Sequence, residues 1–298
     1  MRATDDGAAL TERFEQDRPH LRAVAYRMLG SLAEADDALQ EAWLRANDAG
    51  VAGVENLGGW LTTVVSRVCL NMLRSRDRRR EDPLDARPGA PGGGRSGYDP
   101  EEEAVTADSV GVALLVVLDT LAPAERLAFV LHDLFAVPFD DIAPLLERTP
   151  TAVRQLASRA RRRVRGGTAA AAAGPDLLRR RRVVEAFLAA TRGGDLEALV
   201  ALLHPDVVLH ADRLVVPTPE PIVVSGGRTV AQGALAAMGR ARFTGLALVD
   251  GAFALAMAPQ GRLRLVLTFA VADDGLITGI EIVAEPDRLA AMELTVPA

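Results

Sequence analysis

The sequence contains no lysine, one cysteine and few aromatic residues. All 34 basic residues are therefore arginines, which stand against 40 acidic residues and four histidines and leave a formal net charge of −6. The single cysteine, Cys69, excludes an internal disulfide and is typical of a reducing compartment. The histidines show no ligand spacing, so we expect no metal site. No phosphate loop or nucleotide-binding motif is present, and we expect no cofactor.

Long apolar runs are missing as well. No segment reaches the roughly 18 apolar residues that a membrane span requires. The stretch Met1–Leu10 carries acids where a secretory signal would need an apolar run. We therefore expect a cytoplasmic protein with no membrane partner. A length of 298 residues and a hydrophobic content of 49% fit two or three globular domains.

The arginines are concentrated in a few stretches of the chain. Residues 67–80 carry a net charge of +5, residues 148–165 carry +7 and residues 179–182 carry +4, so the remainder is strongly acidic. Such a chain can bind a polyanion at two places and repel it elsewhere. For each stretch alone, a solvated helix face is the alternative.

Residues 8–82 are predicted to form a first domain of three helices, because apolar residues recur there at helical spacing. Gly30 interrupts the pattern, and Ser31 is suited to cap the second helix, with Glu34 completing a capping box. The third helix is expected from Trp60, with an apolar first half that can pack and a basic second half that can follow a phosphate backbone.

The segment 83–105 is predicted to be a flexible linker, because proline and glycine dominate it. A second helical domain is expected at 106–166. A shorter linker, rich in glycine and alanine, follows at 167–175, and residues 176–298 form the last predicted domain.

The strongest local pattern is a helix-turn-helix in the second domain. Phe139–Leu146 is a short helix, and the next helix begins at Pro150, where proline is favoured, after Thr149 as N-cap. Its expected inward residues are Val153, Leu156, Ala157 and Ala160. The expected outward side chains suit base edges and phosphates, and they are Thr151, Arg154, Gln155, Ser158, Arg159 and Arg162.

The last domain changes to an α+β pattern. A helix pair over 183–203 precedes a series of strand-like runs, which predicts helices packed on an antiparallel sheet. The strands are expected at 207–209, 222–224, 246–249, 252–257, 262–270 and 277–283.

Three segments, in this order, resemble the extracytoplasmic-function sigma factors of the sigma-70 family: DDALQEAWLRA, GWLTTVVSRVCLNMLRSRDRRRE and LAPAERLAFVLHDLFAVPFDDIAPLLERTPTAVRQLASRARRRVR. The resemblance implies that the first binds the β′ clamp helices of core RNA polymerase, through Asp36, Asp37, Gln40, Glu41 and Trp43. It implies that the second melts and reads the −10 promoter element, near Asn71, Arg74, Arg76 and Arg78. The third would read the −35 element with the outward residues named above and contact the β flap. Without this resemblance, the acidic segment around Trp43 is either a solvated face or a docking surface.

The segment RRVVEAFLAATRGGDLEALVALLHPDVVLHADR resembles the SnoaL-like branch of the NTF2-like fold, an α+β cone around a pocket that some of these sigma factors carry. The expected fold class is thus multidomain, with two all-α sigma domains and this cone. Strand alternation puts His210 and Asp212 on one face as candidate pocket residues. They could act in acid–base chemistry, or they could hydrogen-bond structurally or face solvent. The non-catalytic interpretation is favoured, because fold does not imply function.

The resulting hypothesis is a sigma factor, not an enzyme, whose C-terminal domain docks on the sigma domains and regulates them in cis. Two alternatives stay open at this point. One is a SnoaL-type enzyme or ligand-sensing domain fused to a helix-turn-helix module. The other is a ligand-responsive repressor that uses the helix-turn-helix alone.

Overall fold

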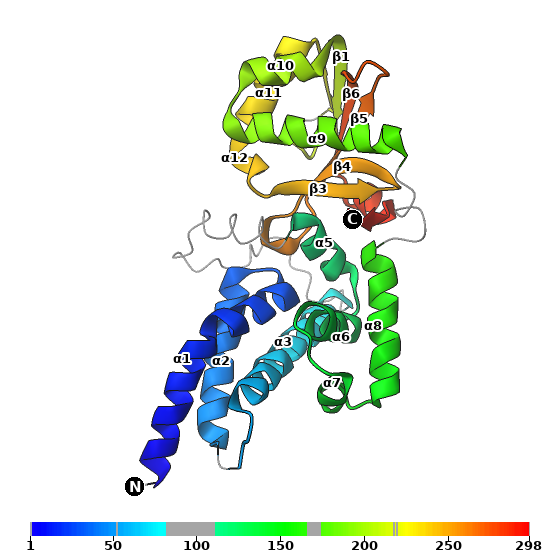
Figure 1. Ribbon diagram of the computed structural model, residues 1–298. Helices are drawn as coiled ribbons and strands as arrows, with labels where there is room; N and C mark the ends of the chain where they lie inside the picture. The colour runs from blue at the N-terminus through cyan, green and yellow to red at the C-terminus, as the bar shows by residue number, and fades with distance from the viewer. Residues whose placement is uncertain are drawn as a thin grey trace. The chain divides into compact units, whose positions relative to one another are not determined.

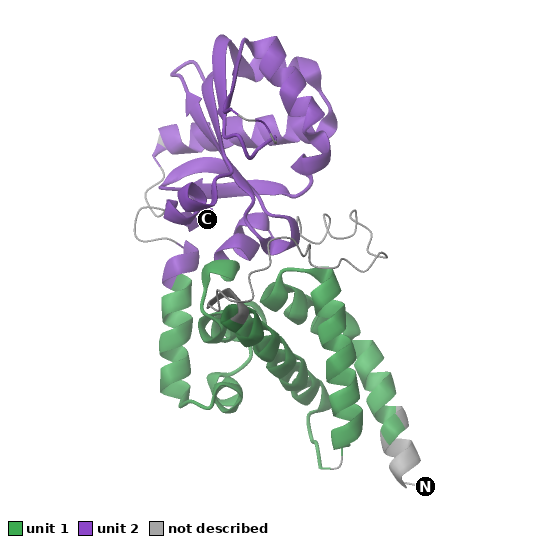
Figure 2. Cartoon of the chain, turned by 180° about the vertical axis from the view of Figure 1, so that it is seen from behind, with its two compact units in different colours: residues 1–103, 118–161 green, residues 104–117, 162–298 purple. Residues whose placement is uncertain are grey.

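The computed structural model describes residues 2–51, 53–81, 111–165, 174–216, 218 and 220–297. The first predicted linker, 83–105, and most of the second, 167–175, lie outside these residues. The chain forms two compact units, Met1–Glu103 with Leu118–Arg161 and Ala104–Val117 with Arg162–Ala298 (Figure 2). We call them unit 1 and unit 2. The grouping differs from the predicted domains, because the first part of the second helical domain clusters with the C-terminal domain.

Unit 1 begins with three packed helices, α1 (Arg2–Leu29), α2 (Leu32–Ala49) and α3 (Leu57–Glu81) (Figure 1). Gly30 ends α1 with a φ of 81°, a conformation that favours glycine. The amide of Glu34 donates to Ser31 Oγ at 3.5 Å, so Ser31 is the N-cap of α2 as predicted. The buried side chains between the helices include Leu21, Tyr26, Leu39, Leu61 and Leu70.

Five shorter elements follow in the second helical region: α5 (Val112–Thr120), α6 (Pro123–Phe129), the π-helical turn η2 (Val130–Leu134), α7 (Phe139–Leu146) and α8 (Pro150–Arg165). The turn after α7 is closed by Glu147, whose φ of 54° reverses the chain. Thr149 Oγ1 then accepts from the amide of Ala152 at 3.3 Å and caps α8. The predicted helix-turn-helix is therefore present, and its four predicted inward residues are all buried.

Unit 2 contains one seven-stranded sheet in the order β2-β1-β6-β5-β4-β3-β7. The strands are β1 (Leu203–Ala211), β2 (Ile222–Ser225), β3 (Thr244–Val249), β4 (Ala252–Met257), β5 (Leu265–Val271), β6 (Ile277–Val283) and β7 (Leu294–Thr295). The helices are α9 (Pro175–Gly193), α10 (Leu196–Leu202), α11 (Gly227–Ala236), α12 (Met238–Ala241) and α13 (Pro286–Ala291), with the 3₁₀ turn η4 (Pro259–Gly261).

The prediction of a purely antiparallel sheet was wrong at one pair. β1 pairs with β6 in parallel, with Leu209 opposite Ile280, whereas β3, β4, β5 and β6 form an antiparallel meander. Alternation of apolar residues tells which face a side chain takes, but it carries no information on the direction of a distant partner strand. The sequence analysis also did not predict α11, α12, α13 and β7.

The two faces of the sheet have different coverings. One face packs against α9, α10 and α11 around a cluster that includes Phe187, Leu199 and Leu255 (Figure 1). On the opposite face, the start of α5 lies against the strands, where Ala113 is buried with Ala247 and Ala256.

Two further contacts join the helical region to this domain within unit 2. A Cβ atom added at Gly245 would lie only 2.8 Å from Val112 Cβ, so α5 approaches β3 as closely as glycine allows. The amide of Val296 donates to the carbonyl of Val164 in the last turn of α8 at 3.0 Å. The ends of two helices of the second helical region are therefore built into unit 2.

Candidate nucleic-acid and polymerase interfaces

The outer face of α8 carries all six residues predicted to read DNA. Each of them is exposed, while the opposite stripe of the helix is buried. The division arises because apolar residues recur every three to four positions in a helix that is otherwise rich in arginine. The predicted outward residues are Thr151, Arg154, Gln155, Ser158, Arg159 and Arg162.

Two of these arginines are oriented by neighbours in unit 1. The guanidinium of Arg154 lies 5.1 Å from the ring centre of Phe139, which itself stacks on His132 at 3.7 Å. Arg159 Nε donates to Glu125 Oε1 at 2.8 Å. The side chain of Glu125 is only 8% exposed, so this carboxylate holds Arg159 and compensates its charge. Arg154 is thus the more available of the two for a phosphate or a base edge.

A second polar stripe follows α3. Asn71, Arg74 and Arg78 are exposed and recur at helical spacing, so they share one face of the helix. Arg67 extends this face by one turn and is exposed as well. Arg67 was not among the predicted residues, although its position four residues before Asn71 could have identified it.

Arg76 lies apart from this stripe. Its side chain is only 15% exposed, and its guanidinium is 2.5 Å from Glu34 Oε2 and 4.0 Å from Asp119 Oδ1. Arg76 does not share the stripe of the other three residues, because a helix turns by about 100° per residue and residue 76 faces α2 instead. Its role near the −10 element stays a prediction. Glu34, expected to complete the capping box, is engaged by this arginine.

Asp119 also binds Arg126, which is nearly fully buried. Arg126 Nη2 donates to Asp119 Oδ1 at 3.1 Å, and its Nη1 donates to the carbonyl of Met28 at 2.9 Å. Burial lowers the pKa of Arg126, and the charge of Asp119 opposes that shift. Glu34, Arg76, Asp119 and Arg126 form a charge network that joins the first three helices to the second helical region within unit 1.

Replacing Asp119 with alanine is expected to lower the free energy of unfolding by about 1–3 kcal/mol, because Arg126 would keep its buried charge without a carboxylate. Urea denaturation followed by circular dichroism measures this. Glu15→Ala is the matched control, since Glu15 forms an exposed ion pair with Arg18 on α1. Equal effects of the two substitutions would show that the charge network adds nothing to stability.

The predicted polymerase-binding residues lie on α2, but they are not equivalent. Asp37 and Gln40 are exposed, whereas Asp36 accepts two hydrogen bonds from Arg22 at 2.9 and 3.0 Å. Trp43 packs on Phe14 with ring centres 5.1 Å apart. Its role in unit 1 is therefore at least partly structural.

Leu44 extends the exposed face of α2. It is 58% exposed, and it follows Asp37, Gln40 and Glu41 at the spacing of one helix face. Sequence analysis did not select it, because a leucine in a helical pattern is usually assigned to the core. The α2 face therefore combines acids with an apolar side chain.

The comparisons with known proteins agree with this arrangement. The model of sigma-70 region 2 matches residues 13–79, and that of sigma-70 region 4 matches residues 111–164. ECF RNA polymerase sigma factor SigJ of Mycobacterium tuberculosis is 44% identical over 200 residues, which is 67% of this chain and 64% of SigJ. Probable ECF RNA polymerase sigma factor SigI of the same species is 38% identical over 65% of this chain and 67% of SigI. The chain belongs to the extracytoplasmic-function (ECF) sigma factors.

The match spans about two thirds of the length of these curated relatives. A crystal structure of the ECF sigma factor SigJ aligns over 94% of this chain and 98% of that one, with 33% identity and a TM-score of 0.44. The two family models assign α1–α3 of this sigma factor to region 2 and α5–α8 to region 4. Unit 2 supplies the α+β architecture that the SnoaL-like resemblance implied.

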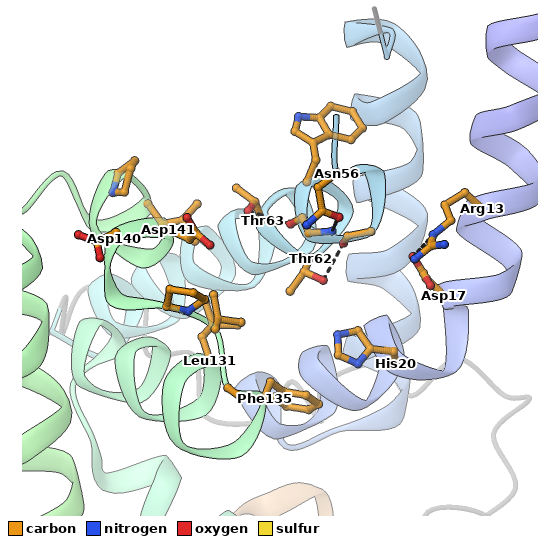
Figure 3. Close-up of a pocket in the computed structure, with 18 residues that line it drawn as sticks. Arg13, Asp17, His20, Asn56, Thr62, Thr63, Leu131, Phe135, Asp140 and Asp141 are labelled. Carbon is orange, nitrogen blue, oxygen red and sulfur yellow. Dashed lines mark hydrogen bonds and ion pairs between the residues drawn. The ribbon is translucent and has the colours of Figure 1, made fainter. Parts of the chain in front are cut away.

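Region 2 and region 4 of this sigma factor enclose a cleft of about 740 Å³ (Figure 3). Asp140 and Asp141 lie on the region 4 wall, and Asp17 lies on the α1 wall. Among the described lining residues Arg13 is the single arginine, and it binds Asp17 at 2.7 Å. The excess of acids makes the cleft unsuited to a nucleic acid backbone in this arrangement.

His210 and Asp212, the candidate pocket residues from strand alternation, do not line the cavity of unit 2. The cavity of unit 2 is lined by Leu209 and Ala211 of β1, so alternation turns His210 to the other face of the sheet. Asp212 Oδ2 accepts from the amides of Ala284 and Glu285 at 2.9 and 3.1 Å. Neither His210 nor Asp212 is among the lining residues. The candidate pocket role of this pair is thereby corrected in favour of the non-catalytic interpretation, which is the one favoured from the sequence.

Asp212 instead ties the end of β1 to the segment before α13, where Arg288 binds its other oxygen at 2.8 Å. Partial burial by itself raises the pKa of Asp212, but the two amides and Arg288 outweigh it, so the pKa lies below its usual value. This carboxylate is therefore a structural group.

Replacing Asp212 with asparagine is expected to cost about 1–2 kcal/mol of stability at neutral pH. Because the folded-state pKa is lowered, the contribution is complete above the ordinary aspartate pKa of about 3.9 and is lost as the pH falls through the folded value. Urea midpoints of the parent and Asp212→Asn should therefore converge only in acid. Asp206→Asn, at an exposed site on β1, is the control. A difference between the urea midpoints of the parent and Asp212→Asn that stays the same from pH 7 to pH 2 would contradict this assignment.

Among the described residues, no helix is long and apolar enough to cross a bilayer. Within the same residues, no group of three or more histidine, cysteine or acidic side chains is arranged to hold a metal ion.

Proposed function

We propose that this ECF sigma factor directs core RNA polymerase to promoters, with α3 at the −10 element and α8 at the −35 element. The observation that carries the proposal is the pair of exposed arginine-bearing stripes on two separate helices, in a chain that is otherwise acidic. Each stripe can neutralise phosphates, and Asn71, Arg154 and Gln155 offer groups that discriminate base edges. The chain itself would supply specificity and leave the chemistry of RNA synthesis to the polymerase.

The α2 face is the proposed contact with the β′ clamp helices, and region 4 is the proposed contact with the β flap. Acidic side chains beside the exposed Leu44 suit a partner helix that is basic at its rim and apolar at its centre. A repressor that used only the helix-turn-helix would have no use for this face.

A selection experiment tests the proposal without knowledge of the promoter. Core polymerase and the chain are incubated with random-sequence DNA duplexes, and the retained duplexes are sequenced. We expect two motifs at constant spacing, and we expect neither when the chain or the polymerase is omitted. Enrichment of a single motif by the chain alone would instead support the repressor alternative.

We further propose that the C-terminal domain restrains region 4 in cis. The support is the packing of Val112 and Ala113 on the sheet and the hydrogen bond between Val296 and Val164, both within unit 2. Regulation then requires a second state in which these contacts are released and the sigma regions engage polymerase. The charge network around Asp119 would be a companion restraint, since it withdraws Arg76 from solvent.

Gly245→Val is expected to weaken this restraint, because any Cβ at that position meets Val112 at 2.8 Å. Promoter-specific transcription should rise several-fold, and hydrogen exchange in residues 112–117 should accelerate. Gly239→Val is the matched control, since an added Cβ there meets nothing within 4 Å. Adding Val112→Gly to Gly245→Val should make room for the new side chain between α5 and β3. Transcription should then return to the low level of the parent. Unchanged exchange and output in Gly245→Val would refute regulation through this contact.

The non-enzymatic assignment also stays a proposal. The enzyme alternative depended on His210 and Asp212. Neither residue lines the cavity, Asp212 is held by the amides of Ala284 and Glu285, and His210 is exposed. Turnover of a small substrate that disappears in Asp212→Asn, but not in Asp206→Asn, would revive that alternative.

A further inference from the structure

Unit 2 contains a cavity of about 380 Å³. It lies between the helices α9 and α11 and the face of the sheet that these helices cover. Side chains from both layers build its wall, among them Phe187 on α9, Val230 on α11 and Leu255 on β4. These three are buried, so they form the deep part of the cavity. The volume falls within the range of small-molecule sites, about 300–1,000 Å³.

The deep wall is chemically apolar, even where it contains hydroxyl groups. Thr191 Oγ1 donates to the carbonyl of Phe187 at 2.8 Å, and Thr244 Oγ1 donates to the carbonyl of Arg240 at 3.2 Å. Their donors are therefore already used by the backbone. Among the described lining residues there is no aspartate, glutamate or histidine. A sugar or nucleotide would lose its hydrogen bonds to water here without replacement.

One charged side chain, Arg240, lies at the rim of this cavity. It is the only charged residue among the described lining residues, and it is exposed. Its Nη1 donates to the carbonyl of Val215 at 3.2 Å, which fixes the guanidinium beside the turn that follows β1. Within the described part of the chain no carboxylate pairs with it, so it can bind an anion from outside.

We propose that this cavity binds a free single-chain amphiphile, with the apolar tail inside and a carboxylate on Arg240. The apolar wall selects the tail through burial of hydrocarbon, and the guanidinium selects the head through a charge-assisted pair. A neutral hydrocarbon would leave the arginine without an anionic partner. A larger polar anion would find few further donors, because the hydroxyls of Thr191 and Thr244 are engaged and Thr229 supplies the remaining lining hydroxyl among the described residues.

The cavity and α5 lie on opposite faces of the sheet, at the same strands β3 and β4. Thr244, Leu255 and Met257 line the cavity, whereas Gly245 and Ala256 are on the other face of the same strands against α5. A shift of β3 or β4 on ligand entry would therefore reach Val112. This consequence depends on the proposed cis regulation, whereas binding itself does not.

Isothermal titration calorimetry of the full chain with dodecanoate, below its micelle concentration, tests the binding without polymerase or DNA. We expect saturable binding of one equivalent, and tighter binding of dodecanoate than of its methyl ester. Arg240→Met should lower the affinity for dodecanoate about tenfold and leave the affinity for the methyl ester unchanged. Arg228→Met is the control, since Arg228 is exposed on α11 outside the cavity lining.

A second pair of variants tests the place of the tail. Gly233 lines the cavity and has open space where a Cβ would stand, so Gly233→Phe should fill the site and abolish binding of both acid and ester. Gly239→Phe adds the same group outside the lining and should bind normally. Absence of saturable binding to the parent would overturn the proposal. So would an acid-to-ester affinity ratio that Arg240→Met leaves unaltered.

Discussion

Replacing Arg154 and Arg162 together with alanine is expected to reduce promoter-specific transcription roughly 100-fold. Both side chains are exposed on the outer face of α8. Each well-placed arginine contact to DNA is worth about 1–3 kcal/mol, and about 1.4 kcal/mol corresponds to a factor of ten. Run-off transcription with core polymerase measures the effect, and Arg18→Ala on α1 controls for loss of an exposed arginine.

The fold should survive this double substitution. Arg154 loses only a cation–π contact with Phe139, worth about 0.5–1 kcal/mol at an exposed site. Arg159 is less suitable for such a test, because its removal would deprive the buried carboxylate of Glu125 of this ion pair and could lower stability. A double variant that folds normally and transcribes at the parental level would remove α8 from promoter recognition.

Salt dependence separates the two ways in which these arginines can act. If they bind phosphate, the plot of log affinity against log salt should become shallower by about 0.9 for each arginine lost, with sequence preference unchanged. If they read base edges, the slope should change little and preference at single positions should relax.

Replacing Leu44 with arginine is expected to lower the affinity for core polymerase by roughly 30- to 100-fold. The substitution removes an apolar anchor of the proposed docking face and places a positive charge among Asp37, Gln40 and Glu41, where a basic partner helix is expected. Fluorescence anisotropy of the labelled chain with core polymerase measures the change.

Leu178→Arg provides a matched control, since Leu178 is 47% exposed on α9, which is not part of the proposed docking face on α2. The control should bind polymerase as the parent does. Equal loss of affinity in both variants would indicate a general effect of the new charge. No loss in Leu44→Arg would place the polymerase contact elsewhere on the chain.

The elements that the sequence predicted well are those with a strong local cause. Ser31 and Thr149 cap helices, and the spacing of apolar residues in α8 fixed its outward face correctly. The strands β4 and β6 were predicted with their observed bounds, because apolar runs between turn residues define them.

What the sequence could not predict depends on distant partners. Arg76 looks like its neighbours in the basic run, but Glu34 and Asp119 come to it from other helices. The parallel pairing of β1 with β6 follows from the path of the chain, and Asp212 meets Ala284 only after that pairing has formed. Alternation put His210 and Asp212 on one face, but it could not tell which face encloses the cavity.

The packing of the start of α5 on the sheet of unit 2 could not be predicted for the same reason. Val112 and Ala113 read as ordinary core residues of a helical domain, and their spacing fits that interpretation. Their partners are Gly245, Ala247 and Ala256, small residues on the far side of a sheet. Small side chains give no distinct sequence signal, although they allow the close approach that holds α5.

Run-off transcription on a duplex recovered by the selection, with purified core polymerase and the full chain, tests the central claim most directly. We predict a discrete transcript that requires the chain, starts at a fixed distance from the two motifs and disappears with Arg154 and Arg162 replaced. A transcript of equal yield and start site from core polymerase alone, or from the double variant, would contradict promoter reading by this chain.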